Sequence, residues 1–215
     1  MRILIIGGGG VTEELLKSVN LKRTQVVVIE KDPNKCAEIG SRYDVLVINK
    51  DATDISVYTS DISMVELDGV LALTNKDEVN VFALTIAKLY NIPMRLARVR
   101  SPKIAELIMR LNLGVPITVP SIIADLVKGY LESIGEPVLV TEFGDFKIMK
   151  ITLSETDKAV GKDLKELELP SDIKVLLIFD GTSLKAPTDS IKFMNGYQVF
   201  VAAPKTEDVI RLFKG

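Results

Sequence analysis

Short apolar segments alternate with helix-patterned segments through the first half of the chain. The apolar segments are short and mostly apolar throughout, which is typical of parallel strands covered by helices on both faces. Strands are therefore expected at 3–6, 25–29, 45–49, 69–73, 94–99 and 117–119, and helices at 12–18, 34–43, 55–60, 77–90 and 102–111. This order predicts an α/β domain with a doubly wound parallel sheet over residues 1–118.

A single amphipathic helix is expected next, over the linking segment 119–135, with Ser121 as its N-cap. Its apolar positions repeat at the spacing of one helix face, and together they form a continuous stripe. They are residues 122, 123, 126, 127, 130, 131 and 134. Two alternatives stay open, because the stripe can pack onto its own domain or onto a partner subunit.

The remainder, residues 136–215, is β-rich and predicts a small α+β domain. Gly144-Asp145 between two strand-like segments indicates a hairpin, and Asp180-Gly181 reads as a second hairpin turn. The expected strands are 138–143, 146–153, 175–179 and 198–202, with a short helix near 164–167 and a terminal helix at 206–213.

The composition excludes several classes of function. The net charge of −2 provides no basic field for nucleic acid, and no apolar segment has the length of a membrane span. The N-terminal segment does not have the pattern of a signal peptide. The chain has no histidine and one cysteine, Cys36, which we expect to be a half-buried thiol. Histidine-based catalysis and histidine or thiolate metal sites are therefore excluded.

The segment "IIGGGGVTEELLK" places four glycines between the first strand and the first helix. Gly7 and Gly9 occupy the first two positions of a Rossmann-like dinucleotide fingerprint. Gly7 would allow a tight turn, and the N–H groups of Gly9, Gly10 and Val11 would point at phosphates. The third position is Thr12 instead of glycine. Three alternatives follow: the helix stands away from the strand, Thr12 is the N-cap, or its hydroxyl touches a phosphate.

Glu30 ends the second strand and strengthens this interpretation. A carboxylate there can accept hydrogen bonds from both ribose hydroxyls of an adenine nucleotide, and it would repel a 2′-phosphate. The alternative is a solvated acid at the end of a strand.

Taken in order, these motifs resemble the RCK family of Trk and Ktr type, the regulators of potassium conductance. The resemblance rests on "IIGGGG", "VVVIEKDPNKC", "NKDATD", "ALTNKDEVNVFALTIAK", "ARVRSP", "LGVPITVPSIIADLV" and "GKDLKELELP", and it covers essentially the whole chain. It implies a cytoplasmic regulatory protein that binds NAD(H) or ATP/ADP, forms homodimers and higher rings, and gates a membrane potassium channel or transporter. Attachment to the inner face of the membrane would be peripheral, through the transport subunit.

The resemblance also assigns the site residue by residue. Gly7 to Val11 would hold phosphates, Glu30 the ribose, Asp51 and Ala52 the adenine; Leu73 and Thr74 would line the floor, and Arg98 would reach a phosphate. The full expected set is Gly7, Gly8, Gly9, Gly10, Val11, Thr12, Glu30, Lys31, Asp51, Ala52, Leu73, Thr74 and Arg98. Asp51 could instead form an Asx turn, and Arg98 an ion pair.

Two further expectations concern positions outside that set. Related proteins bind divalent cations near the positions of Asp77 and Glu78, but acids in a first helical turn are ordinary and nothing else here supports a cation. The second domain departs from the family at Asp180 and at Asn195-Gly196, which argues against a ligand there.

The function expected is therefore a non-catalytic nucleotide sensor that gates a potassium transport protein. One alternative is a structural subunit whose nucleotide site has degenerated, with Thr12 as the sign. Another is an NAD-dependent oxidoreductase, which is disfavoured because no histidine is present and no Tyr-x-x-x-Lys pair follows the fourth strand.

Overall fold

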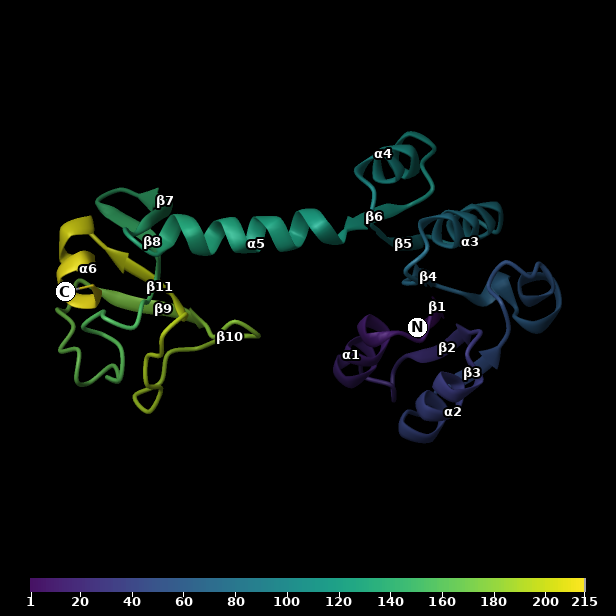
Figure 1. Ribbon diagram of the computed structural model, residues 1–215, viewed down its shortest axis with the longest axis horizontal. Coiled ribbons are helices and arrows are strands. Elements are labelled where there is room, and N and C mark those ends of the chain that lie inside the picture. Colours follow the sequence, from purple (N-terminus) through teal and green to yellow (C-terminus); the bar gives the residue numbers. More distant parts are fainter. Residues whose placement is uncertain (215) are drawn as a thin grey trace. The chain divides into compact units, whose positions relative to one another are not determined.

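The computed structural model describes residues 1–214, which form two compact units. The first unit is Met1–Ile122, and the second begins at Ile123 (Figure 1). The domain limits expected from the sequence, after residues 118 and 135, stay predictions.

The first unit contains a six-stranded parallel sheet in the order β3-β2-β1-β4-β5-β6. Its strands are β1 (Arg2–Ile6), β2 (Gln25–Glu30), β3 (Leu46–Asn49), β4 (Gly69–Ala72), β5 (Met94–Val99) and β6 (Val115–Thr118). Its four α-helices are α1 (Gly10–Ser18), α2 (Pro33–Arg42), α3 (Asp77–Leu89) and α4 (Pro102–Arg110). The predicted doubly wound fold is confirmed.

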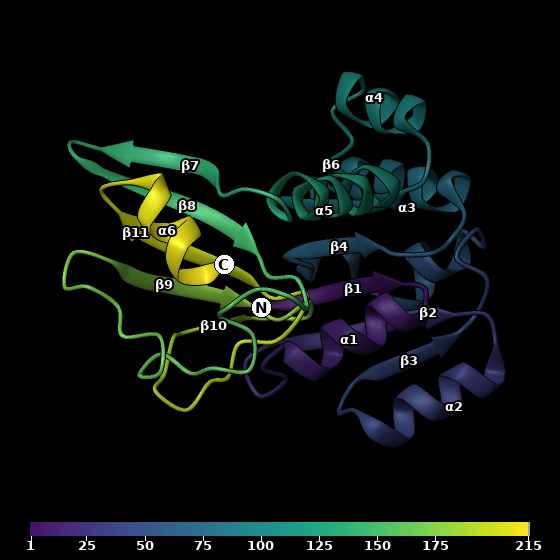
Figure 2. The ribbon, with the colours of Figure 1, turned by 60° about the vertical axis from the view of Figure 1, so that its left-hand side comes forward.

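Both faces of this sheet are buried, and successive residues of β1 show why the strands are apolar throughout. Leu4 and Ile6 belong to one core cluster, which includes residues of α3 and α4. Ile3 and Ile5 belong to another, which includes residues of α1 and α2. Because side chains alternate along a strand, each face needs its own apolar set. Figure 2 shows the parallel strands between these helices.

The connection after β3 differs from the expected helix at 55–60. A π-helical turn, Val57–Asp61, and a 3₁₀ turn, Met64–Glu66, occupy this region. The buried Tyr58 anchors it, because its hydroxyl donates to the Ala52 carbonyl at 2.7 Å.

The second unit contains a five-stranded antiparallel sheet in the order β10-β9-β11-β8-β7. Its elements are β7 (Val138–Phe143), β8 (Phe146–Thr152), β9 (Lys174–Phe179), β10 (Leu184–Lys185), β11 (Gln198–Ala203) and helix α6 (Thr206–Phe213). Both predicted hairpin turns are present, β10 was not predicted, and the helix expected at 164–167 is wrong. That segment is a turn in which the Leu167 N–H donates to the Asp163 carbonyl at 3.2 Å.

Asp180 explains why the second hairpin closes where it does. Its carboxylate pairs with Lys185 at 2.6 Å and accepts from the backbone N–H groups of Thr182 and Ser183. The bond from Lys185 is the largest cause that lowers the pKa of Asp180 far below its usual value. Its role is therefore that of a turn residue, as the sequence predicts.

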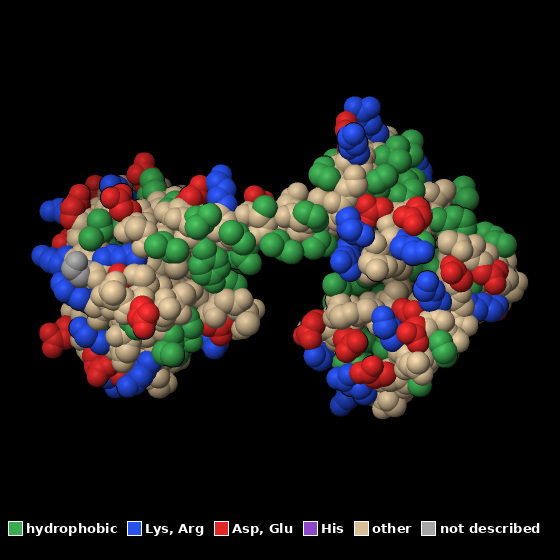
Figure 3. All heavy atoms as spheres, in the orientation of Figure 1, with side chains coloured by type: hydrophobic (Ala, Val, Ile, Leu, Met, Phe, Trp, Pro, Cys, Tyr) green, Lys and Arg blue, Asp and Glu red, His purple; other side chains and the backbone are tan. Residues whose placement is uncertain are grey.

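Helix α5 (Val119–Ser133) carries the apolar stripe. It begins at Val119, so the expectation that Ser121 is its N-cap is wrong. Most of the stripe is exposed, and Figure 3 shows hydrophobic side chains gathered along this helix. The exposed fractions are 55% for Ile122, 56% for Ile123, 45% for Leu126, 52% for Val127, 70% for Leu131 and 46% for Ile134. No helix in the described range combines the length and apolar character that crossing a membrane requires.

The end of α5 is fixed to the second unit by polar contacts. The buried hydroxyls of Ser133 and Thr152 lie 2.6 Å apart. The ammonium group of Lys214 donates to the Ile134 carbonyl just beyond the helix and pairs with Asp157 at 2.7 Å. The helix terminus and the antiparallel sheet therefore form one packed body.

Candidate nucleotide-binding site

The glycine turn lies at the carboxyl end of β1, beside β2 and β4. At this point the strand order reverses, and doubly wound sheets bind ligands there. Gly7 has φ +98°, a left-handed conformation that favours glycine. Its N–H donates to the Ile29 carbonyl at 2.8 Å. A β-carbon on Gly7 would lie 3.1 Å from both Cγ2 and N of Thr74, so only glycine fits comfortably.

The next three glycines differ in their surroundings: Gly8 is closely packed, whereas Gly9 and Gly10 face open space. A β-carbon on Gly8 would lie 2.6 Å from Cδ1 of Ile39, so Gly8 allows α2 to approach. A β-carbon on Gly9 or Gly10 would meet no atom within 4 Å. Neither position has the left-handed backbone that would require glycine. No atom of the described residues fills the space at these two glycines. This space lies at the first turn of α1, where the backbone N–H groups have no intrahelical partners.

Thr12 has a structural role that the sequence did not reveal. Helix α1 begins at Gly10 and Gly9 is its N-cap, so Thr12 lies inside the first turn. Its side chain is fully buried, and its hydroxyl donates to the Gly7 carbonyl at 2.5 Å. The expectations that Thr12 caps the helix or touches a phosphate are therefore wrong. Thr12 instead ties the helix to the glycine turn.

Replacing Thr12 by valine tests this role. We expect Thr12→Val to lower the free energy of unfolding by about 1–3 kcal/mol, because the buried Gly7 carbonyl loses its donor. Thr12→Ser keeps the hydroxyl and should lose less. A matched control is Thr85→Val, since the Thr85 hydroxyl also donates within its helix but is exposed. Urea unfolding of the three variants measures the difference, and equal stability of Thr12→Val and Thr85→Val would contradict this role.

Glu30 joins two loops at the end of β2. Its Oε2 accepts from the Gly8 N–H at 2.6 Å, and its Oε1 accepts from the Asp32 N–H at 2.9 Å. Glu30 is half-buried, so it is not the fully solvated acid of the alternative reading. Each carboxylate oxygen has a second lone pair, which leaves acceptor capacity for a ribose hydroxyl.

Asp51 and Ala52 follow β3 in a tight turn. Oδ1 of Asp51 accepts from N and Oγ1 of Thr53 at 2.9 and 2.8 Å, which is the predicted Asx turn. The backbone bond from Thr53 is the largest cause that lowers the pKa of Asp51. No hydrogen bond within residues 1–214 reaches Oδ2 of this exposed side chain. The turn therefore occupies one oxygen and leaves the other available.

The far side of the site is formed by the ends of β4 and β5. Leu73 is buried, and Thr74 packs against the glycine turn. Arg98, at the end of β5, has a buried Nε that has no hydrogen-bond partner among the described residues. No ion pair of Arg98 occurs in the same range, so the alternative ion-pair role is not realised there. An unpartnered guanidinium nitrogen beside the site fits an anionic ligand. Lys31, beyond Glu30, is exposed.

Asp77 and Glu78 do not form a metal site with their neighbours. The carboxylate of Asp77 accepts from the N–H groups of Arg100, at 2.9 Å, and Ser101, at 3.0 Å, and so holds the β5–α4 connection. Glu78 is exposed. Across residues 1–214, no three acidic, histidine or cysteine side chains come together as cation ligands.

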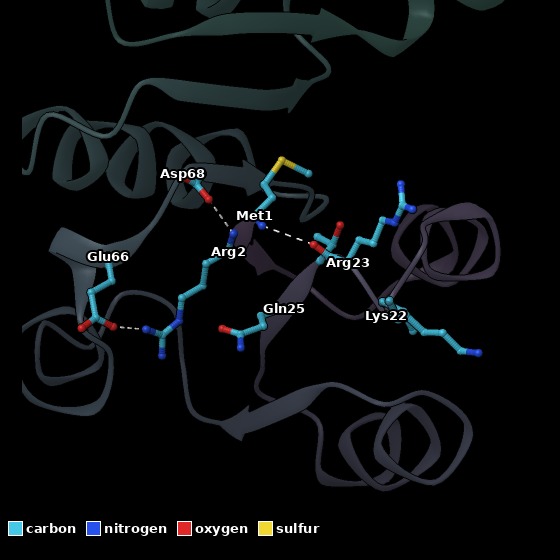
Figure 4. A pocket seen from close by; sticks show the side chains of 9 residues that line it. Met1, Arg2, Lys22, Arg23, Gln25, Glu66 and Asp68 are labelled. Atoms are coloured by element: carbon cyan, nitrogen blue, oxygen red, sulfur yellow. Dashed lines mark hydrogen bonds and ion pairs between the residues drawn. The ribbon is translucent and has the colours of Figure 1, made fainter.

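A separate hollow of about 450 Å³ lies at the opposite, amino-terminal edge of the parallel sheet (Figure 4). It is polar and holds both signs of charge, because Arg2 pairs with Glu66 and its N–H donates to Asp68 at 2.7 Å. Lys22 and Arg23 point away from that pair. None of the predicted site residues lines this hollow, so it is unrelated to the glycine turn.

Sequence reasoning missed Asn80, in the first turns of α3. Its side chain is fully buried and bonded to the ends of both β4 and β5. The only signal was an asparagine between two valines in an amphipathic helix. This signal does not show which strands the amide contacts.

A glycine turn at the switch point, with a strand-end acid on the next strand, defines a Rossmann-like nucleotide-binding domain. The TrkA-N domain model matches residues 3–119, more than half of the chain. The chain therefore belongs to the TrkA-N domain family, and the resemblance to RCK proteins is confirmed.

Two curated relatives and one solved structure show the range of similarity. The chain is 28% identical to a Trk system potassium uptake protein TrkA homolog of Archaeoglobus fulgidus, over 100% of this chain and 49% of the relative. It is also 28% identical to the Trk system potassium uptake protein TrkA of Mycobacterium tuberculosis, over 97% and 96%. The GsuK channel bound to NAD superposes with a TM-score of 0.65 at 19% identity, over 98% of this chain and 39% of that chain. The chain thus spans about half the length of the first relative, and the likeness to GsuK shows the fold alone.

Proposed function

We propose that this protein is a nucleotide-sensing regulatory subunit of a potassium transport system. The support from outside the chain is the TrkA-N family model and relatives that are named potassium uptake proteins. The ligand proposed is an adenine nucleotide, NAD(H) or ATP/ADP. A channel of the same fold has been solved with NAD, which supports this class of ligand.

The proposal is carried by an open space and an unpartnered cation at the same edge of the sheet. The protein leaves the space at Gly9 and Gly10 open. The buried Nε of Arg98, near the end of β5, has no hydrogen-bond partner among the described residues. Glycine without conformational need is costly, because it enlarges the entropy of the unfolded chain. A ligand that fills the open space and offers negative charge would explain both features. Phosphate groups meet both requirements.

In the proposed site, groups at the ends of different strands each contact one part of the nucleotide. Glu30 accepts from ribose hydroxyls, the first-turn N–H groups of α1 hold phosphate oxygens, and Arg98 supplies a fixed cation. Asp51 offers Oδ2 to the adenine amino group. In this proposal the site is a sensor that acts through binding. A ligand shifts an assembly only by its different affinity for two arrangements.

The exposed stripe of α5 supports a homodimer as the unit of that assembly. Five large apolar side chains on one face of α5, and Ile134 just beyond it, are exposed in the single chain. We propose that they join two subunits, that dimers form a higher ring, and that the ring contacts a membrane potassium channel or transporter. The protein would then be cytoplasmic, attached peripherally to the inner face of the membrane through that partner.

Gly9→Ala tests the cradle without disturbing the fold. We expect the affinity for the preferred nucleotide to fall about tenfold, because the added methyl group occupies the phosphate space. Any loss of stability should be small, because alanine meets no atom there and only its weaker preference for the N-cap position opposes it. Gly135→Ala is the matched control, because that glycine also faces open space and belongs to the second unit. Isothermal calorimetry with ATP, ADP, AMP, NAD and NADH gives the affinities and identifies the ligand.

The outcomes separate the alternatives. Binding that is weakened in Gly9→Ala and unchanged in Gly135→Ala supports the sensor. Wild-type protein that binds none of the five nucleotides supports a structural subunit with a degenerate site. Thr12 no longer favours that alternative, because its side chain is turned into the protein and leaves the cradle open. Transfer of hydride from bound NADH to a carbonyl substrate would instead identify an oxidoreductase.

A further inference from the structure

Asn80 has a complete set of hydrogen bonds although it lies fully buried on the core face of helix α3. Its Oδ1 accepts from N and Oγ1 of Thr74, at 3.1 and 2.7 Å. Its Nδ2 donates to the carbonyls of Thr74 and Arg98, at 3.0 and 2.8 Å. A buried amide is costly unless all its groups are satisfied, and here both donors and both lone pairs are used.

These four bonds connect the ends of two neighbouring strands. Thr74 follows β4 and Arg98 lies near the end of β5, and these strands pair in parallel. The β4–β5 ladder itself reaches Ala72 and Ala97. Beyond that point, the Asn80 amide joins the two chain segments where the strand hydrogen bonds have ended.

The same bonds act on two parts of the candidate site. Thr74 is the residue against which Gly7 packs, so fixing both its N–H and its carbonyl fixes one wall of the glycine turn. Holding the Arg98 carbonyl restrains the backbone that carries the unpartnered guanidinium. Ala83 and Leu84, three and four residues further along α3 on the same helix face, belong to the apolar core. An apolar residue would fill this position without satisfying the Thr74 and Arg98 groups.

We propose that Asn80 is a positioning residue of the nucleotide site, one that sets the half of the site formed by β4 and β5. This inference rests on the proposed nucleotide-binding function. In doubly wound folds the adenosine lies on the side of the second strand, and a dinucleotide extends across the switch point to the other side. Asn80 therefore acts on the part of NAD beyond its first phosphate and has little effect on AMP, which Glu30 and the glycine turn hold.

The test compares NAD and AMP in calorimetry of the full chain. In Asn80→Ala and in Asn80→Asp, which keeps the shape but loses both donors, we expect the affinity for NAD to fall at least about tenfold. The affinity for AMP should fall by no more than about twofold. Ile108→Val is the control for a general loss of stability, because Ile108 is fully buried in α4. Ile108→Val should lower the melting temperature about as much as the Asn80 variants do, but it should leave the affinities for NAD and AMP unchanged.

A purely structural role predicts a different result. In that case NAD and AMP would lose affinity in equal proportion, or neither would change in a folded variant, and either result overturns the inference. Where the Asn80 variants fail to fold, Thr74→Val removes one of the same bonds and should show the same preference against NAD. An unchanged ratio of the two affinities in Thr74→Val overturns the inference too. Wild-type protein that binds ATP or ADP but not NAD would overturn the inference and leave the proposed function standing. Wild-type protein that binds none of ATP, ADP, AMP, NAD and NADH would refute the proposed function itself, which is a distinguishable failure.

Discussion

Glu30→Ala should lower the affinity for every adenine nucleotide by about a hundredfold. In the proposed site this carboxylate accepts from the ribose hydroxyls, and a hydrogen bond to a charged group contributes about 1.5–3 kcal/mol. The substitution also removes the acceptor of the Gly8 and Asp32 N–H groups. The glycine turn therefore loses an internal support together with its ribose contact.

These two losses can be separated by a second variant and a control. Glu30→Gln keeps one oxygen acceptor, so it should recover part of the stability but little of the affinity. Glu38→Ala removes an acid from exposed α2, where the carboxylate pairs with Arg42, and should change neither quantity. Calorimetry gives affinities and urea unfolding gives stability. Wild-type affinity in Glu30→Ala would show that the ligand, if any, does not use the ribose position.

The sheet of the first unit could be predicted because both of its faces are buried. A strand such as β1 is apolar at every position after Arg2, and few other structures require that pattern. Gly7 could be assigned for a related reason, since a strand followed by a glycine turn and a helix leaves few conformations. Helix ends were less certain. Glycine has low helix propensity, which concealed that α1 begins at Gly10 and not at Thr12.

The roles of Thr12 and Asn80 depended on tertiary contacts that the sequence does not encode locally. Whether the Thr12 hydroxyl faces a phosphate or the Gly7 carbonyl is decided by a rotation of one helix against one turn. The partners of Asn80 lie on two different strand ends, and Arg98 is far from it in sequence. The prediction of a helix at 164–167 was wrong for a local reason. The helical pattern there is too short to nucleate a helix, and the segment forms only a turn.

The stripe on α5 was left with two alternatives by the sequence, and its exposure now favours a partner subunit. Most surface patches this apolar mark interaction sites. Its neighbours along the helix provide an internal comparison, because Ala124 lies outside the stripe and is exposed as well. An aspartate in the stripe and an aspartate at Ala124 therefore lie on the same helix, and only the first places a charge on the apolar face.

We expect Ile123→Asp combined with Leu126→Asp to weaken a homodimer by at least about a thousandfold, because two carboxylates would be desolvated against an apolar face. The fold should be retained, since the two side chains are 56% and 45% exposed in the single chain. Sedimentation velocity should show dimers for the wild type and for Ala124→Asp, and monomers for the double variant with an unchanged melting temperature. Dimers in all three proteins would place the subunit interface elsewhere, and the proposed homodimer through the α5 stripe would then be wrong.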